Sequence, residues 1–158
     1  MTSLRPLSGV LLAAALSHCA VLAATATGNM VVTATVLDTC VLVVPPLAFG
    51  NYSGTQLDAQ SDVLVTCTGT TAWTVDIDGG GAADIANRVM TGATDTLGYQ
   101  LYNDAGRSVI FGDGTTGSTV TGTGLGTAQT VSVYGRIPAD NFADIGAYTD
   151  TVTVTVTY

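Results

Sequence analysis

The stretch TVTVTVTY, residues 151–158, alternates threonine with valine or tyrosine at every position. Successive side chains of a β-strand point to opposite faces, so this pattern predicts a strand with the threonines on one face. Val152, Val154, Val156 and Tyr158 share the other face. No residue follows to turn back over the strand, and an uncovered strand with an apolar face invites pairing with another chain.

Shorter alternating runs of the same kind recur along the chain. They lie at residues 61–67, 73–77, 97–102, 109–111 and 131–135, with Gly- and Asp-rich stretches between them. The stretch NDAG between the third and fourth runs is typical of a hairpin turn. The sequence lacks Glu and Lys, two strong helix formers, and only residues 82–90 could supply a helical turn or two. We therefore expect an all-β antiparallel sandwich, with residues 112–126 as a loop or a weak hairpin.

Residues 1–23 show the order of features of a secretory signal peptide. A single arginine precedes the apolar run 10–16, and small residues fit cleavage after Ala23 or after Ala26. A lipoprotein signal is the alternative, because LSHC at residues 16–19 loosely resembles the box before a lipidated cysteine. The apolar run is shorter than the roughly 18 residues of a membrane span, and no later run reaches that length. We therefore expect an exported chain without a membrane span.

Cleavage after Ala23 leaves 135 residues (158 less 23), the size of one ordinary domain. It also removes the single His and one of the three Cys. Cys40 and Cys67 remain, and if they pair at all they pair with each other. A bridge between them would stabilise the fold by roughly 3–4 kcal/mol in the chain-entropy model.

The charge inventory argues against most ligands and against catalysis. Three Arg and twelve Asp give the mature chain a net charge of −9, so nucleic acid and anionic membranes are not expected to bind. Without a His, no Ser-His-Asp or Cys-His arrangement can form. The Asp residues stand in turn-like stretches, where Asp bonds its own backbone. Arg107 and Arg136 are expected to be surface counter-charges to nearby Asp, whereas the sequence assigns no role to Arg88.

A metal site is also not expected. DIDGGG at residues 76–81 opens like an EF-hand loop, but the loop lacks the acidic fifth position and the bidentate Glu at the twelfth. We therefore expect no enzyme, no cofactor and no metal site. A secreted carbohydrate- or cation-binding module, with a loosely held surface Ca²⁺, is one alternative.

The segment that precedes Cys40 also alternates. Met30, Val32, Ala34 and Val36 share one face, and the other face carries Val31, Thr33, Thr35 and Leu37. Because it lies outside the loop between the two cysteines, this segment is free to leave its own domain. A free strand at one end and an unguarded strand at the other suggest strand exchange between subunits, with a self-contained sandwich as the alternative.

Several short motifs run in order from Cys40 to the end of the chain. They are FGNY at residues 49–52, VTC at 65–67, VDIDGG at 75–80, NRVM at 87–90, LGYQLYNDA at 97–105, FGDG at 111–114, YGRIP at 134–138 and GAYTD at 146–150. Together these motifs resemble the spore coat protein U family, which includes the pilins of archaic chaperone–usher pili. The resemblance covers nearly all of the mature chain.

The resemblance implies an incomplete immunoglobulin-like antiparallel β-sandwich, completed by a donor strand from a neighbouring subunit. A periplasmic pilus chaperone would fill the open groove first, and the N-terminal segment of the next subunit would replace it at an outer-membrane usher. By position, residues 24–37 correspond to the donor strand, with Met30, Val32, Ala34 and Val36 inserted, and residues 38–158 to the domain. Which face of the donor enters the groove stays open.

Two further sets of residues take their roles from the resemblance. Val152, Val154, Val156 and Tyr158 would border the groove and pair with the chaperone or the donor. Cys40 and Cys67 would form the family disulfide.

The resemblance also implies the function. We expect a structural subunit of an extracellular pilus on a Gram-negative cell, polymerised with copies of itself or related pilins, for adhesion or biofilm formation. A spore- or cell-coat protein of the same fold is the alternative. A single domain favours a shaft or adaptor subunit over an adhesive tip.

Overall fold

The computed structural model describes residues 23–158, so the expected signal peptide, residues 1–23, lies outside the described residues except for Ala23. Residues 35–158 form one compact unit and are described by themselves. Residues 23–39 have no regular secondary structure. A search of residues 23–158 finds no helix of the length and apolarity needed to cross a membrane.

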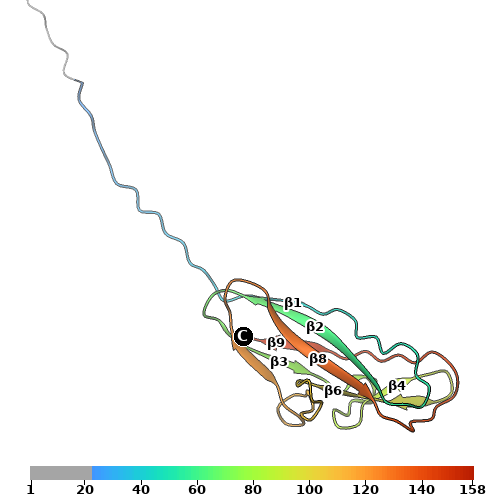
Figure 1. Ribbon diagram of the computed structural model, residues 1–158. Coiled ribbons are helices and arrows are strands. Elements are labelled where there is room, and N and C mark those ends of the chain that lie inside the picture. Colours follow the sequence, from blue (N-terminus) through green and yellow to red (C-terminus); the bar gives the residue numbers. More distant parts are fainter. Residues whose placement is uncertain (1–22) are drawn as a thin grey trace, which may run out of the picture. The chain divides into compact units, whose positions relative to one another are not determined.

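The unit is built from antiparallel sheets, as expected from the alternating runs (Figure 1). The first sheet has the order β1-β2-β8-β6, formed by Cys40–Val43, Leu57–Cys67, Gln129–Ile137 and Gln100–Tyr102. The second has the order β7-β3-β9, formed by Val120–Thr123, Ala72–Ile77 and Val154–Thr157. A small third sheet pairs β4 (Val89–Thr91) with β5 (Thr96–Gly98). The all-β antiparallel fold class is thereby confirmed.

The core lies between the two larger sheets. Strands β2 and β8 pair along nine positions, and every second residue of each turns inward, which is the period-2 rule of a half-buried strand. In Figure 1 these two strands run along the front of the domain, with β3 and β9 behind them. The buried hydrophobic side chains come from the two larger sheets, from β5 and from loops: Val63, Val65, Cys67, Trp73, Val75, Ile77, Leu97, Tyr99, Leu101, Phe111, Val131, Val133 and Ile137.

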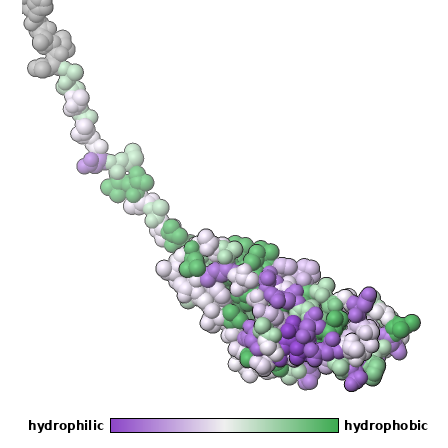
Figure 2. Space-filling model, viewed as in Figure 1, coloured by the Kyte–Doolittle hydropathy of each residue, from purple (hydrophilic) through white to green (hydrophobic). Residues whose placement is uncertain are grey.

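The outward face of β2 and β8 is largely polar. Asp58 of β2 accepts two hydrogen bonds from Arg136 of β8, and Ser132 donates to Asp62. Figure 2, in the same view, shows a hydrophilic area in purple on this face. Arg136 is therefore the surface counter-charge expected from the sequence.

Two local elements differ from what the sequence predicted. Residues 82–90 form no α-helix; the structure has a 3₁₀ turn η1 at Gly80–Ala82, and then Asp84 accepts hydrogen bonds from Ala86 N and Asn87 N. An Asp that bonds its own backbone offers the chain an alternative to a helix. Residues 112–126, expected to be a loop or a weak hairpin, contain strand β7, which pairs with β3.

The disulfide between Cys40 and Cys67 is present and joins the first residue of β1 to the last residue of β2. The two residues are also directly opposite in the strand register, so the bridge reinforces an existing pairing. It closes a loop with a sequence separation of 27, and a loop of that length corresponds to about 3.5 kcal/mol in the chain-entropy model.

Arg88, to which the sequence assigned no role, is fully buried. Its guanidinium donates hydrogen bonds to five oxygen atoms, the carbonyls of Ile77, Asp78, Ile85 and Phe111 and Oε1 of Gln100. Burial lowers the pKa of Arg88, and the neighbouring Tyr99, Asp78 and Asp150 oppose that shift. One side chain thus ties together four segments that are separate in the sequence.

Candidate functional site

An apolar groove opens between the two sheets, on the side where β1 and β9 are the outermost strands. Its walls are residues 44–54 and residues 141–154, and its volume is about 1260 Å³. The inward side chains of the core lie at its base, among them Val63, Ile77, Leu97, Leu101, Val133 and Ile137. A large apolar hollow in the core of a sandwich exposes surface that the fold would otherwise bury.

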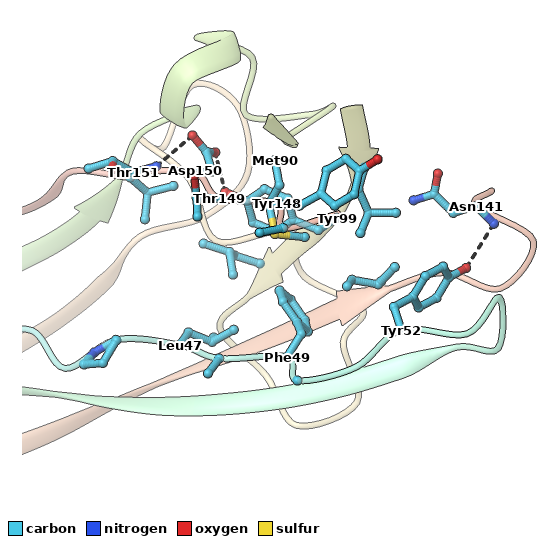
Figure 3. Close-up of a pocket in the computed structure, with 18 of the residues that line it drawn as sticks. Leu47, Phe49, Tyr52, Met90, Tyr99, Asn141, Tyr148, Thr149, Asp150 and Thr151 are labelled. Carbon is cyan, nitrogen blue, oxygen red and sulfur yellow. Dashed lines mark hydrogen bonds between the residues drawn. The ribbon is translucent and has the colours of Figure 1, made fainter. Parts of the chain in front are cut away.

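The first wall is the chain that follows β1. Pro45 and Pro46 come directly after the strand, and proline has no N–H to continue the ladder with β2. Leu47 and Phe49 nevertheless turn inward, as Figure 3 shows. They fit because β8 has Gly135 opposite them, where a Cβ would lie 2.7 Å from the Phe49 ring. Phe49 also meets the ring of Tyr99 edge-on, at 6.1 Å between centroids.

The second wall leads into β9 and is fastened by two aspartates. Asp150 accepts hydrogen bonds from Gly81 N (2.8 Å), Thr151 N (2.8 Å) and the Tyr99 hydroxyl (2.6 Å). Asp78 Oδ1 accepts from Gly80 N and Thr153 N, both at 2.9 Å. The wall is therefore held to the end of β3 through side chains before the regular strand begins.

These contacts shift the pKa values of the groups involved. Burial, together with the hydrogen bond to Asp150, raises the pKa of the Tyr99 hydroxyl above its ordinary range. Burial would raise the pKa of Asp78, but the hydrogen bonds donated by Thr153 and Gly80 outweigh it and hold that pKa below its usual value. Tyr99 thus stays a neutral donor and Asp78 a charged acceptor at neutral pH.

A set of hydrogen bonds joins the two walls at one end of the groove. The Tyr52 hydroxyl donates to Pro138 O (2.7 Å) and accepts from Asn141 N (3.0 Å). Asn141 Nδ2 in turn donates to Gly98 O (2.7 Å). Figure 3 shows the contact between Tyr52 and Asn141 beyond Phe49. An extended chain lying in the groove therefore meets a closed end at Tyr52.

The edge of β9 that faces the groove has unpaired backbone groups. Asp78 N donates to Thr153 O (3.1 Å), which continues the β3–β9 register. Backbone groups of successive strand residues point to opposite sides, so the N–H and C=O groups of Val152, Val154 and Val156 point away from β3. No strand within residues 23–158 pairs with them.

The structure places the expected groove residues unequally. Val152 and Val154 line the groove, and Val156 is half-buried against the core farther along β9. Tyr158 is 57% exposed and is not part of the lining. Strand β9 itself covers only residues 154–157 of the expected 151–158, because Asp78 takes the backbone N–H of Thr153.

The expected donor residues lie outside any strand. Met30, Val32 and Val36 are 84–88% exposed, and Ala34 is exposed as well. The neighbours on the opposite face, Val31 and Leu37, are exposed too. An isolated run of exposed apolar residues is unusual for a soluble surface and needs a partner to cover it.

The first wall of the groove was missed from the sequence. FGNY at residues 49–52 was noted as a motif, but nothing in its pattern predicted that Phe49 and Tyr52 line a groove. The double proline after β1 is the one local signal, since it marks where the strand leaves the sheet but the chain continues alongside. The hydrogen bonds by which Asp150 fastens the second wall come from Tyr99 and Gly81, which are distant in the sequence.

Apolar side chains and the free backbone edge of β9 make up most of this site. A search of residues 23–158 finds no group of three or more His, Cys, Asp and Glu side chains placed to hold a metal ion. The groove offers apolar surface and one row of backbone donors and acceptors. This combination suits the binding of an extended apolar peptide as an added strand.

Comparisons with known proteins agree with the geometry. The family model described as Spore Coat Protein U domain matches residues 26–155. Protein U of Myxococcus xanthus is 31% identical over an alignment of 121 residues that covers 72% of this chain and 67% of that protein.

A solved structure shows the same fold. It is a chain of the CsuC–CsuE chaperone–tip adhesion subunit pre-assembly complex from the archaic chaperone–usher Csu pili of Acinetobacter baumannii. The TM-score is 0.59 at 24% identity, over 78% of this chain and 40% of the solved one. This chain therefore spans less than half the length of the solved chain that it matches.

Proposed function

The chain belongs to the Spore Coat Protein U domain family, and on this premise we propose that it is a structural subunit of an extracellular pilus of the archaic chaperone–usher type. The subunits polymerise by donor-strand exchange, and the fibre serves adhesion or biofilm formation. The observation that carries the proposal is the apolar groove beside the unpaired edge of β9.

An inserted strand meets both needs of the groove. The free edge of β9 offers backbone donors and acceptors at alternate residues, as an edge strand does to an added one. The side chains at the base of the groove are apolar, and an extended peptide places every second side chain against them. Hydrogen bonds and burial of apolar area are then gained in one step, which is why an added strand binds more firmly than a loop.

The N-terminal segment, residues 24–37, is the donor that the chain itself offers. Its run Met30–Leu37 has eight residues and extends about 26 Å at 3.3 Å per residue. The first wall from Val44 to the closed end at Tyr52 spans nine residues, a closely similar length. The face with Met30, Val32, Ala34 and Val36 is entirely apolar, whereas Thr33 and Thr35 stand on the other, so the first face enters the groove.

Partners and compartment follow from the same proposal. A monomer with an open groove needs a periplasmic chaperone to cover it, and an outer-membrane usher to exchange the chaperone for the next subunit. Residues 1–23 are the signal peptide and residues 38–158 the pilin domain. The solved complex pairs a chaperone with a pilus subunit, which supports a chaperone as the first partner of this fold.

A coat protein is the second candidate, favoured by the family's description as a spore coat domain. Its subunits would exchange strands in the same way but form a layer. Electron microscopy of the cell surface separates the two, because a pilus appears as discrete fibres and a coat as a continuous sheet.

The test compares periplasmic protein as full-length chain and with residues 24–37 deleted, each with and without its chaperone. We expect the full-length chain alone to elute as polymers in gel filtration and to give SDS-resistant ladders in gel electrophoresis. The deletion should give neither. Val32→Asp should also abolish polymers, because it places a charge in the apolar groove. Thr33→Asp is the matched control, since its side chain faces away, and should still polymerise. A soluble, stable monomer from every variant without chaperone would overturn the proposal.

A further inference from the structure

Three consecutive residues, Asp38, Thr39 and Cys40, connect the N-terminal segment to the domain, and we call them the root. Cys40 is held by the disulfide to Cys67. Thr39 O accepts a hydrogen bond from Thr68 N (3.0 Å), which continues the β1–β2 register one residue beyond the strand. The root is therefore bonded to the end of β2 and to the turn that follows it.

A chain of hydroxyl groups fixes the remaining atoms of the root. Thr39 N donates to Thr68 Oγ1 (3.2 Å), Thr68 and Thr71 share a hydrogen bond of 2.7 Å, and the Thr71 hydroxyl donates to Asp38 Oδ1 (2.8 Å). Since the Thr71 proton goes to Asp38, the shared proton comes from Thr68. Thr71 is only 5% exposed, so its hydroxyl depends on Asp38 as its acceptor.

The root therefore continues the line of β1 backwards, away from the groove wall at residues 44–54. For the N-terminal segment to enter the groove of its own domain, the chain has to reverse before Asp38. A tight turn takes four residues, which here are residues 34–37.

The register that follows such a turn decides the outcome. Thr33 would lie opposite Asp38, Met30 opposite Val41, and Thr27 opposite Val44, where the groove wall begins. The apolar run would be used up beside β1 and in the turn, and the polar residues before it would face the groove. Even a turn made at the root leaves the disulfide at Cys40 as a fixed point, so at most the first few residues of the run reach the groove.

We propose that the fixed root, placed directly after the apolar run, prevents the run from filling its own groove and so commits it to a second copy of the chain. This inference rests on the proposed strand exchange. The partner is thus selected by spacing: the run is too close to its own domain to reach the site that it fits.

The experiment lengthens the chain at the root. A Gly/Ser linker of about twelve residues has an average span of roughly 19 Å, which matches the six residues, about 20 Å, between Asp38 and Val44. Inserted between Leu37 and Asp38, the linker frees the run to turn back. The same linker inserted between Thr27 and Gly28 leaves the run next to the root and is the matched control.

We expect the wild type and the control to polymerise and the Leu37 insertion to form monomers. At about 10 µM protein, a tethered donor with an effective concentration near 1 mM favours its own groove on the order of a hundredfold. The monomer should resist heat and SDS because its groove is filled. Val32→Asp in the same linker variant should abolish that resistance, which separates a self-filled monomer from a chain that fails to assemble.

The outcomes distinguish a failure of this inference from a failure of the proposed function. If the Leu37 insertion still yields only polymers while wild type and control polymerise, the inference is wrong and the proposed function stands. If the insertion gives monomers that Val32→Asp leaves equally heat-resistant, the run does not fill the groove and the inference is again wrong. If neither wild type nor control polymerises, the proposed function itself fails.

Discussion

The two sheets meet differently at Arg88 and at the groove. Around Arg88, five oxygen atoms from separate segments converge on one buried guanidinium, and every acceptor is satisfied within the chain. At the groove, the walls stand apart, and the valines of β9 present their backbone groups to no strand of residues 23–158. Around Arg88 the chain therefore satisfies its own polar groups, whereas at the groove it leaves an apolar hollow and a free strand edge, which are the basis of the proposed strand exchange.

The largest effect is expected where the fold is closed. Arg88→Met removes all the donors and takes from the buried carbonyl oxygens of Ile77, Asp78 and Phe111 the hydrogen bonds that Arg88 supplies, so the free energy of unfolding should fall by about 3–5 kcal/mol. Urea unfolding followed by the fluorescence of Trp73, the single tryptophan, measures it. Arg136→Met, which breaks the exposed pair with Asp58, is the control and should cost about 0–1 kcal/mol. Equal losses for the two variants would mean that the buried network does not hold the sheets together.

A smaller effect on stability is expected at the groove. Gly135→Val places a side chain against Phe49 and Leu47, and the open groove gives these two side chains room to move. We expect the free energy of unfolding to fall by about 1 kcal/mol, the low end for overpacking, and polymer formation to fall sharply because the displaced side chains occupy the donor's place. Gly69→Ala, where a Cβ meets nothing within 4 Å, is the control. A large loss of stability with normal polymerisation would show that Phe49 belongs to the core and not to the groove.

The smallest effect is a dependence on acid at the junction of the two regions. The pKa of Asp78 is lower in the folded chain, so its stabilising contribution is complete above its ordinary value of about 3.9 and is lost as the pH falls through the folded-state value. Asp78→Asn should therefore lose less stability than wild type between about pH 4 and pH 2. Urea midpoints across this range measure it, with Asp76→Asn as the neighbouring control. Parallel curves for wild type and Asp78→Asn would contradict this assignment.

Alternation in the sequence was enough to predict the long strands, because one face of each is buried: Val63 and Val65 in β2, or Val131 and Val133 in β8, repeat every second residue. The run at residues 97–102 is instead divided between β5 and β6, which lie in different sheets. The hairpin around NDAG is also present, with Asn103 N bonded to Val109 O. The partners of Arg88 were not predictable, because four of its five acceptors are backbone carbonyls, which every residue has. The first wall of the groove was missed because residues 44–54 show no alternation typical of a strand. The two prolines are the one local signal there.

The position of the disulfide has a mechanical consequence for a fibre joined by inserted strands. Tension along such a fibre enters each domain at the strand in its groove and leaves through the chain that begins at Cys40. The bridge transfers this pull directly to Cys67 at the end of β2, which is paired with β8 over nine positions. The load runs along these strands, so their hydrogen bonds are strained in shear and must break together rather than one by one. The wall at residues 44–54 lies off this path, and a pulled subunit keeps the shape of its groove.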